Sequence, residues 1–289
     1  MSLISVIIPT RNRIDDLTKV LPSYLAEPSI LEIIIVDDST QETPIKKIRD
    51  VVRMDPRLVL APSASPHGLP AARNRGIWQA KGEFIFFGED DLELSPDHFS
   101  ILLSHLKETG ADIIGGRKIW KKAGESNEMA FERAKNFKGP LWNSFYMECD
   151  SEQTPLCDTP VPLLLSHFLA KKEVFQKVLF EENYEGFVRG FPWREETDFL
   201  MKAGEMGFRT FFCPHAVGFQ APTDGGGIHD PSFWQQEYWI LKNHHFLLQR
   251  HRSFIREKLG NPWPPFVLLV AYALHRFKGQ LRSRLSKLF

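Results

Sequence analysis

Short runs of apolar and β-branched residues alternate with amphipathic stretches along the first 115 residues of the chain. Near-continuous apolar runs of this length, separated by helices, are typical of parallel strands that are buried on both faces. The pattern therefore predicts a Rossmann-like α/β fold, in which helices flank a mainly parallel central sheet. The predicted strands are Ile4–Ile8, Leu31–Val36, Leu58–Leu60, Phe84–Phe87 and Asp112–Ile114.

The stretches between these strands have the spacing of amphipathic helices. One helix should begin after Asn12, with Pro22 kinking or interrupting it. A second is predicted at Leu69–Ala80. A third, at Asp97–Thr109, should open with a cap at Ser95 and a proline in its first turn.

The pattern weakens between Lys121 and Pro162, where polar and aromatic residues are mixed. This stretch is long for a connection inside a compact domain and is typical of a lid or binding loop. Regular patterns return beyond it, and the glycine run at 225–227 should form a mobile loop. The further predicted elements are helices at Lys171–Leu179, Glu195–Met206 and about Ser232–Arg250, and a strand at Thr210–Cys213.

Composition and charge narrow the function classes. At 289 residues the chain is long enough for one elaborated domain, or for one domain with a small appendage. Its 36 basic residues balance 36 acidic residues, which argues against a nucleic-acid partner. The three cysteines are an odd number without metal-ligand spacing, so we expect reduced thiols. No basic leader precedes the first apolar run, so we expect a cytoplasmic protein.

Two polar motifs follow the first two predicted strands, and ligands bind at the carboxyl ends of strands in open parallel sheets. The turn Pro9–Arg13 offers backbone amides, a hydroxyl and two cationic side chains to a nucleotide diphosphate, although a plain strand-to-helix turn would look similar. In Asp37-Asp38-Ser39, a carboxylate can accept a hydrogen bond from a ring N–H of uracil, thymine or guanine. The alternative for this motif is a helix cap.

Two more motifs complete the series. Gly68–Gly76 would place Arg73 or Arg75 on a helix that begins near the phosphates, or else on a solvated helix face. Gly88–Glu93 clusters carboxylates directly after an apolar strand. A hard divalent cation that also chelates two phosphate oxygens relieves their repulsion, so the motif predicts metal binding rather than an ordinary acidic turn.

The ordered strings SVIIPTRNR, EIIIVDDS, GLPAARNRG, FIFFGEDD and REETDF resemble inverting glycosyltransferase family 2, which has the A-type glycosyltransferase fold. The resemblance covers roughly residues 2–220. It implies a donor site for a nucleotide-diphosphate sugar and a divalent cation, Mn²⁺ or Mg²⁺. The predicted nucleotide-sugar-binding residues are Pro9, Thr10, Arg11, Asn12, Arg13, Asp38, Ser39, Gly68, Arg73, Asn74 and Asp90.

The resemblance also implies roles for the acidic residues. Asp91 is the expected direct metal ligand, with Glu89 in support, although the family usually has aspartate where this chain has Glu89. Inverting transfer needs one general base to deprotonate the acceptor hydroxyl. The second acid of the REETDF pair has this role in the family, so Glu196 is the expected base and Asp198 the second choice. First-turn acids also complement a helix dipole, which is the structural alternative.

A histidine near the diphosphate is common in the family, after a proline-containing strand end. Gln220 stands near the expected place, and His215 and His229 are the alternatives. By the resemblance, residues 1–230 form the catalytic domain, with a nucleotide-sugar-binding half at 1–115 and an acceptor half at 116–230. Residues 231–289 form a C-terminal helical extension.

The predicted function is inverting transfer of a sugar to an acceptor hydroxyl, in cell-envelope polysaccharide, glycolipid or glycan synthesis. The donor base, the sugar and the acceptor stay open. One alternative is a catalytically inactive nucleotide-sugar-binding or scaffolding protein of the same fold. Another is a sugar nucleotidyltransferase, which would need a glycine-rich, lysine-bearing phosphate loop that PTRNR does not supply.

The C-terminal segment predicts a membrane-surface helix. The apolar run Phe266–Leu274 is shorter than the ~20 residues needed to cross a bilayer. We expect this helix to dock on the inner face of the membrane, near a glycan or lipid-linked acceptor. Packing of the run against the catalytic domain is the alternative. The tail that follows contains no acid and carries Arg276, Lys278, Arg282, Arg284 and Lys287.

Overall fold

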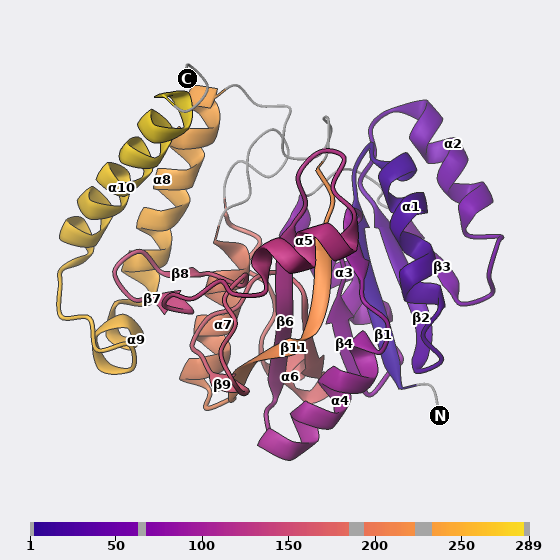
Figure 1. The fold of residues 1–289 in the computed structure, drawn as a ribbon, viewed down its shortest axis with the longest axis horizontal. Helices are drawn as coiled ribbons and strands as arrows, with labels where there is room; N and C mark the ends of the chain where they lie inside the picture. The colour runs from indigo at the N-terminus through magenta and orange to yellow at the C-terminus, as the bar shows by residue number, and fades with distance from the viewer. Residues whose placement is uncertain (1–2, 63–67, 185–193, 223–232, 286–289) are drawn as a thin grey trace.

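The computed structural model describes residues 3–62, 68–184, 194–222 and 233–285, and it confirms the predicted α/β architecture (Figure 1). The glycine run at 225–227, Ser232 and His229 lie outside the described residues. The strands are β1 (Ile4–Thr10), β2 (Ile30–Asp37), β3 (Leu58–Pro62), β4 (Phe84–Phe87), β5 (Leu92–Leu94), β6 (Ile113–Trp120), β7 (Trp142–Asn143), β8 (Glu148–Cys149), β9 (Thr159–Pro160), β10 (Phe168–Lys171) and β11 (Thr210–Gln220).

Helices cover both faces of the sheet that these strands build (Figure 1). They are α1 (Ile14–Leu25), α2 (Glu42–Val51), α3 (Leu69–Gln79), α4 (His98–Thr109), α5 (Asn127–Ala134), α6 (Lys172–Lys177), α7 (Glu195–Glu205), α8 (Phe233–Arg250), α9 (Arg252–Glu257) and α10 (Pro265–Leu285).

Within the described residues, nine strands form one sheet in the order β3-β2-β1-β4-β10-β6-β11-β5, with β9 paired to β11 outside this path. The pairs β1–β2, β1–β4, β2–β3 and β6–β11 are parallel, as predicted. Strands β10 and β5 are antiparallel to their neighbours and were not predicted. They span four and three residues, which is too short for a periodic signal in the sequence.

The two faces of the sheet bury separate cores, and this explains the continuous apolar runs. In β1, Ile7 belongs to the core with α3, α6 and α7, whereas Val6 and Ile8 belong to the core with α1, α2 and α4. Alternate side chains along one strand thus enter opposite cores. Most positions are therefore apolar, because neither face is solvated, and the buried Ser5 and Glu32 hydrogen-bond to each other over 2.7 Å.

Three local predictions need correction. Helix α1 continues through Pro22, whose neighbours Leu21 and Tyr24 are buried against the sheet and hold the turn in place. Helix α4 begins at His98, and its N-cap is Asp97 in the left-handed region at φ 61°. Ser95 is therefore not the cap. It accepts the His98 N–H through its backbone carbonyl instead, and its proline neighbour precedes the helix.

Strands β1, β2 and β3 extend one or two residues beyond their predicted ends, and two other strands are much longer than predicted. Strand β6 continues through Gly115-Gly116 to Trp120, although paired glycines weaken an isolated strand. Strand β11 continues past Pro214 to Gln220, because its register shifts between Cys213 and Val217 and takes up the proline as an irregularity.

The C-terminal helices α8 and α10 pack side by side at one edge of the molecule (Figure 1). Leu268 and Tyr272 of α10 are buried, and the Tyr272 ring lies 4.0 Å from the His244 ring of α8. None of the helices that the structure describes is long and apolar enough to cross a membrane.

Candidate active site

A cavity of about 820 Å³ opens at the carboxyl ends of the central strands. Strand β1 contributes Thr10, the β4 end contributes Asp91, β6 contributes Lys118 and β11 contributes Gln220. The first turn of α7 closes another side with Glu196. Motifs far apart in the sequence therefore meet where the parallel topology predicted that strand ends would gather.

The acidic motif after β4 is held by a single arginine. The Arg13 guanidinium lies 2.9 Å from the Asp90 carboxylate and also pairs with Asp91. Thr10 donates a second hydrogen bond to Asp90, 2.8 Å long. Both carboxylates are more than nine-tenths buried, so each needs such partners.

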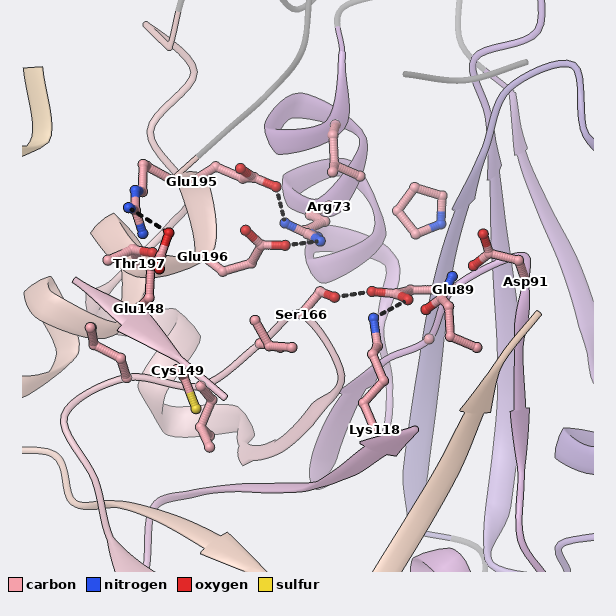
Figure 2. A pocket seen from close by; sticks show the side chains of 18 of the residues that line it. Arg73, Glu89, Asp91, Lys118, Glu148, Cys149, Ser166, Glu195, Glu196 and Thr197 are labelled. Atoms are coloured by element: carbon pink, nitrogen blue, oxygen red, sulfur yellow. Dashed lines mark hydrogen bonds and ion pairs between the residues drawn. The ribbon is translucent and has the colours of Figure 1, made fainter. Parts of the chain in front are cut away.

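Glu89 faces a different cation. Lys118 Nζ lies 2.6 Å from its carboxylate, and the Ser166 hydroxyl donates to the other carboxylate oxygen (Figure 2). These contacts join the β4 end to β6 and to the segment that leads into β10. The Glu89 carboxylate thus lies between Lys118 and Ser166 in the cavity wall.

The raised pKa values of Asp90 and Glu89 indicate an excess of negative charge in this motif. Burial raises the pKa of Asp90 to about 7, and the neighbouring Asp91 and Glu89 add to this, although Arg13 opposes it. Burial likewise raises the pKa of Glu89, with Asp91 contributing. Arg13 and Lys118 do not fully compensate the buried Asp90 and Asp91 and the half-buried Glu89, so this donor set fits a hard divalent cation.

Across the cavity, Arg73 of α3 binds two consecutive glutamates of α7 (Figure 2). Its guanidinium nitrogens lie 3.0 Å from Glu195 and 3.0 Å from Glu196. The guanidinium also lies over the Phe180 ring, 5.1 Å from its centre. This fork fixes the orientation of both carboxylates, because the planar cation offers its donors in one rigid geometry.

The pKa values of the two glutamates are shifted in opposite directions. Burial raises the pKa of Glu195 well above its usual range, and the neighbouring Glu196 raises it further. Burial also acts on Glu196, but Arg73 and the neighbouring Glu195 outweigh it and lower the pKa of Glu196. Of the two carboxyls, Glu196 therefore loses its proton more readily. Glu196 is also the more exposed of the two side chains, at 21% against 2%, and so can accept a proton from a bound molecule.

At the opposite end, Asp38 lines the cavity just beyond β2. The backbone N–H of Gly68 donates to its carboxylate over 3.1 Å, and Arg75 lies 3.4 Å away. Its neighbour Asp37 instead accepts the N–H of Ser39 and so shapes the loop. Two acids that are adjacent in sequence thus have separate roles.

The structure brings most of the predicted site residues together, but four lie outside the cavity lining. Asn12, at φ 58°, accepts the Thr40 N–H and ties the turn after β1 to the loop after β2, and its own N–H donates to the Ser39 hydroxyl. Asn74 is buried and exchanges hydrogen bonds with the Phe180 backbone. The residues that line the cavity are Pro9, Thr10, Arg11, Arg13, Asp38, Gly68, Arg73, Glu89, Asp90, Asp91 and Glu196.

Asp198 is the fourth such residue. Its side chain is 0% exposed and contacts His251 at 2.8 Å and Arg250 at 3.1 Å. This ion-pair network joins α7 to α8 and to the turn before α9. Asp198 therefore stabilises the packing of these helices, whereas Glu196 faces the cavity.

The weakly patterned stretch at 121–162 does contribute to the site, since Trp142 and Tyr146 line the cavity. Gln220 lines it as well, whereas His215 is exposed on β11 and does not. The sequence interpretation missed Lys118 and His275. A cation near the end of an apolar strand could have indicated Lys118, but no sequence signal indicates His275 of α10, which stacks on Tyr146 at 4.1 Å.

Comparison with known proteins agrees with this geometry. The family described as Glycosyl transferase family 2 matches residues 5–177. A curated relative from Campylobacter jejuni, GalNAc(5)-diNAcBac-PP-undecaprenol beta-1,3-glucosyltransferase, is 31% identical over 132 residues. That match covers 45% of this chain and 43% of the relative, so the chain spans less than half of the relative's length.

Two solved structures have the same fold. Staphylococcus aureus TarS 1-349, in complex with UDP-GlcNAc, matches with a TM-score of 0.59 and 18% identity, over 86% of this chain and 66% of its own. The mannosyltransferase PcManGT from Pyrobaculum calidifontis, in complex with GDP-Man and Mn²⁺, also has a TM-score of 0.59, with 17% identity over 94% and 69% of the two chains. The sheet and its flanking helices are thus those of the A-type glycosyltransferase fold.

Proposed function

The chain belongs to glycosyltransferase family 2, and we propose that it transfers a sugar, with inversion, from a nucleotide-diphosphate donor to an acceptor hydroxyl. The observation that carries this proposal is the arrangement of charge across the cavity. An ionised carboxylate, Glu196, is held by Arg73 on one side, and the acidic motif Glu89–Asp91 lies on the other. Transfer needs these two kinds of group, a base for the hydroxyl and a cation site for the departing diphosphate.

Donor binding is assigned to the first half of the chain, residues 1–115. Asp38 is placed to accept a hydrogen bond from a ring N–H of the base, and its contact with the Gly68 N–H keeps the carboxylate oriented. Pro9, near the end of β1, and Arg11, just after it, line the cavity, and the Arg11 guanidinium suits the diphosphate. The comparison structures hold UDP-GlcNAc and GDP-Man, and Asp38 can pair with either base.

A divalent cation, Mn²⁺ or Mg²⁺, would be held by Asp91, with Glu89 in support. When bound, it neutralises charge on the diphosphate as the leaving group departs. The raised pKa values of Asp90 and Glu89 support this assignment, because the carboxylates lack full compensation from Arg13 and Lys118. Arg13 would remain beside the motif and share its negative charge with the cation.

Glu196 is the proposed general base. The acceptor oxygen attacks the anomeric carbon, the bond from that carbon to the diphosphate oxygen breaks, and the hydroxyl proton passes to the Glu196 carboxylate. Arg73 binds both Glu195 and Glu196 and so holds the Glu196 carboxylate in place. Asp198 is not assigned this role, because His251 and Arg250 occupy its buried carboxylate.

The acceptor half is assigned to residues 116–230, and we propose a glycan or lipid-linked acceptor. The Campylobacter jejuni relative is named for an undecaprenol-linked acceptor. Trp142 and Tyr146 offer flat apolar surfaces beside the cavity, which suit the faces of sugar rings.

Helix α10 supports a location at the inner face of the membrane. Phe266, Val270, Leu274 and Phe277 are 41–71% exposed, and their spacing puts them on one side of the helix. Leu268 and Tyr272, on the opposite side, are buried against the protein. The helix therefore has two apolar faces, and the predicted packing against the catalytic domain accounts for only one of them.

The charge of this segment suits an anionic surface. Residues 258–289 contain no acid, and beyond Leu274 the chain carries Arg276, Lys278, Arg282, Arg284 and Lys287. The side chains from residue 281 onward are outside the described part. Because His275 of the same helix lines the cavity, docking of the exposed face would bring the cavity close to the lipid surface.

A thermal-shift screen of UDP, dTDP and GDP, each with and without Mn²⁺, tests the proposed function. A ligand at about a hundred times its dissociation constant stabilises a protein by roughly 2.7 kcal/mol. We expect one nucleotide to raise the melting temperature, and to do so only with the cation. If no nucleoside diphosphate shifts it with Mn²⁺, the donor assignment fails.

A further inference from the structure

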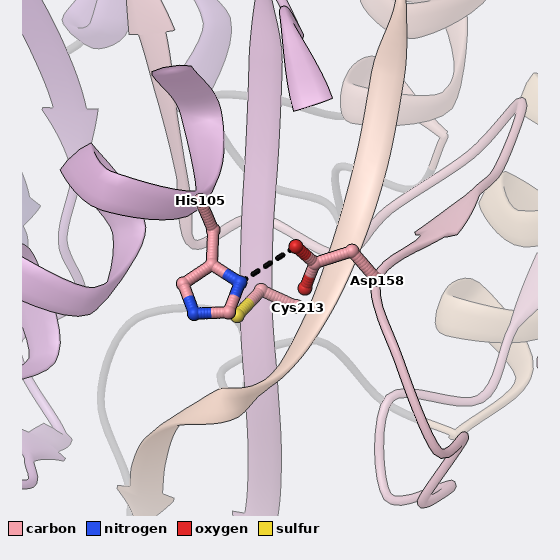
Figure 3. Close-up of side chains that lie close together, drawn as sticks. All are labelled: His105, Asp158 and Cys213. Atoms are coloured by element: carbon pink, nitrogen blue, oxygen red, sulfur yellow. Dashed lines mark hydrogen bonds and ion pairs between the residues drawn. The ribbon is translucent and has the colours of Figure 1, made fainter. Parts of the chain in front are cut away.

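A second group of metal-binding side chains lies away from the cavity. His105 of α4, Asp158 from the segment before β9 and Cys213 of β11 point toward one another (Figure 3). Their donor atoms all lie within 4.8 Å, and His105 Nδ1 is 2.6 Å from Asp158 Oδ2. The other oxygen of Asp158, Oδ1, is buried and makes no hydrogen bond within the described part of the chain.

An irregularity in β11 brings a second histidine near these three side chains. Cys213 pairs with Gly116, and Val217 pairs with the next residue, so three residues are extruded from the strand. The extruded residues include His215, whose ring centre lies 5.5 Å from that of His105. Gly116 makes this possible, because a Cβ at that position would lie 2.5 Å from the Ala216 carbonyl oxygen. Such bulges often redirect a side chain next to a functional site.

We propose that His105, Asp158 and Cys213 bind a zinc ion, with His215 as the fourth ligand. Zinc prefers four ligands in a tetrahedral arrangement and accepts thiolate, imidazole and carboxylate together. The His215 ring is exposed, and as the fourth ligand it would have to turn toward the other three. The cavity motif differs, since its donors are carboxylates that suit a harder cation.

The position of the cluster indicates a structural role for this ion. Cys213 pairs with Gly116 and Gln220 pairs with Trp120, so four residues of strand, about 13 Å, separate Cys213 from the cavity-lining Gln220. His105, Asp158 and Cys213 do not themselves line the cavity. The ion would fasten α4 and β11 to the segment that includes Asp158. The same segment begins at β8, where Glu148 and Cys149 line the cavity. Zinc would therefore stabilise one wall of the cavity without contacting the donor.

Zinc titration of the chelator-treated full chain tests the proposal by calorimetry, with bound metal counted by elemental analysis. We expect one high-affinity zinc per chain. Cys213→Ser and Asp158→Asn should each weaken binding by at least about 100-fold, since loss of an outer-shell partner alone costs about 10- to 100-fold. Cys157→Ser is the matched control, because Cys157 is exposed and outside the cluster, and it should bind zinc as the parent does.

Cobalt gives a second readout that separates the two metal sites. Co²⁺ in the proposed site should show a thiolate charge-transfer absorption that is lost in Cys213→Ser and kept in Asp91→Asn. Asp158→Asn covers the case in which Cys213→Ser fails to fold. The proposal is overturned if the parent binds no zinc, if Cys213→Ser and Asp158→Asn both bind it unchanged, or if the absorption is absent. None of these outcomes bears on the donor site, which Asp91→Asn reports separately.

Discussion

The guanidinium of Arg73 donates a 3.0 Å hydrogen bond to the carboxylate of Glu196, 123 residues further along the chain. The contact joins α3, in the donor half, to α7, in the acceptor half. It also sets the charge of Glu196, because Arg73 is the main influence that lowers the pKa of this carboxyl against the effect of burial. The two halves of the cavity are thus linked through the residue that we propose as the base.

Replacing this arginine tests that link. Arg73→Lys keeps the charge, but one ammonium cannot bind Glu195 and Glu196 in the same planar fork. The pKa of Glu196 should rise, so the acidic limb of the kcat profile should move to higher pH, with a fall in kcat of about tenfold, equivalent to about 1.4 kcal/mol. Arg133→Lys, on α5 outside the cavity, is the control. Unchanged pH limbs in Arg73→Lys would show that Arg73 does not set the charge of the base.

Metal dependence is tested at Asp91. Asp91→Asn should abolish the effect of Mn²⁺ on nucleotide affinity and leave the fold intact, because an amide keeps the size of the side chain and removes the charge. Glu93→Gln is the matched control, since Glu93 belongs to the same acidic run but does not line the cavity. Calorimetry of nucleoside diphosphate binding with and without Mn²⁺ would contradict the assignment if Asp91→Asn retained the full metal effect.

The raised pKa of Asp90 predicts a pH dependence of stability without metal. The folded state favours protonated Asp90, so this stability is complete below the ordinary aspartate pKa of about 3.9 and is lost as pH rises through about 7. Asp90→Asn should remove that loss between about pH 4 and pH 7. Backbone and Lys171 contacts lower the pKa of Asp112 despite its partial burial, so Asp112 adds stability as pH rises. Asp112→Asn should remove that gain. Denaturant unfolding in chelator measures both, and parallel curves for parent and Asp90→Asn would refute the Asp90 account.

Much of the fold could be predicted because its signal is local. The runs in β1, β2 and β4 are almost continuously apolar, since each strand is buried on both faces, and Ser5 and Glu32, the polar residues inside the first two runs, hydrogen-bond to each other. The acidic and basic motifs follow these strands directly, so a parallel sheet alone brings them together. Strands β5 and β10, in contrast, lack the run of four apolar residues that marks β4.

The rest of the site depends on contacts that no local pattern records. Asn12 and Asn74 belong to the strings that resemble the family, yet their amides bind loop backbone outside the cavity. His275 enters the site only because α10 packs on α8. Cys213 and His105 are 108 residues apart, and spacing along the chain cannot reveal that they meet.

Membrane docking is tested by changing the exposed face of α10. Leu274→Ser with Phe277→Ser should reduce binding to anionic liposomes by roughly tenfold or more, because each such side chain contributes about 1.5–3 kcal/mol when buried. Leu156→Ser with Trp78→Ser is the matched control, as those side chains are 98% and 68% exposed elsewhere. Flotation with anionic and neutral vesicles gives the bound fractions. Equal flotation of the parent and the α10 variant would remove the case for a docking face.

The most direct test of the account is the turnover of Glu196→Gln, measured as release of nucleoside diphosphate from the donor that the thermal-shift screen identifies. The amide removes the base but keeps a partner for Arg73, so donor affinity should match that of the parent. We predict a fall in turnover of about 10²- to 10⁴-fold, the usual contribution of a general base. Turnover within a few-fold of the parent, with donor affinity unchanged, would contradict the assignment of Glu196 as the catalytic base.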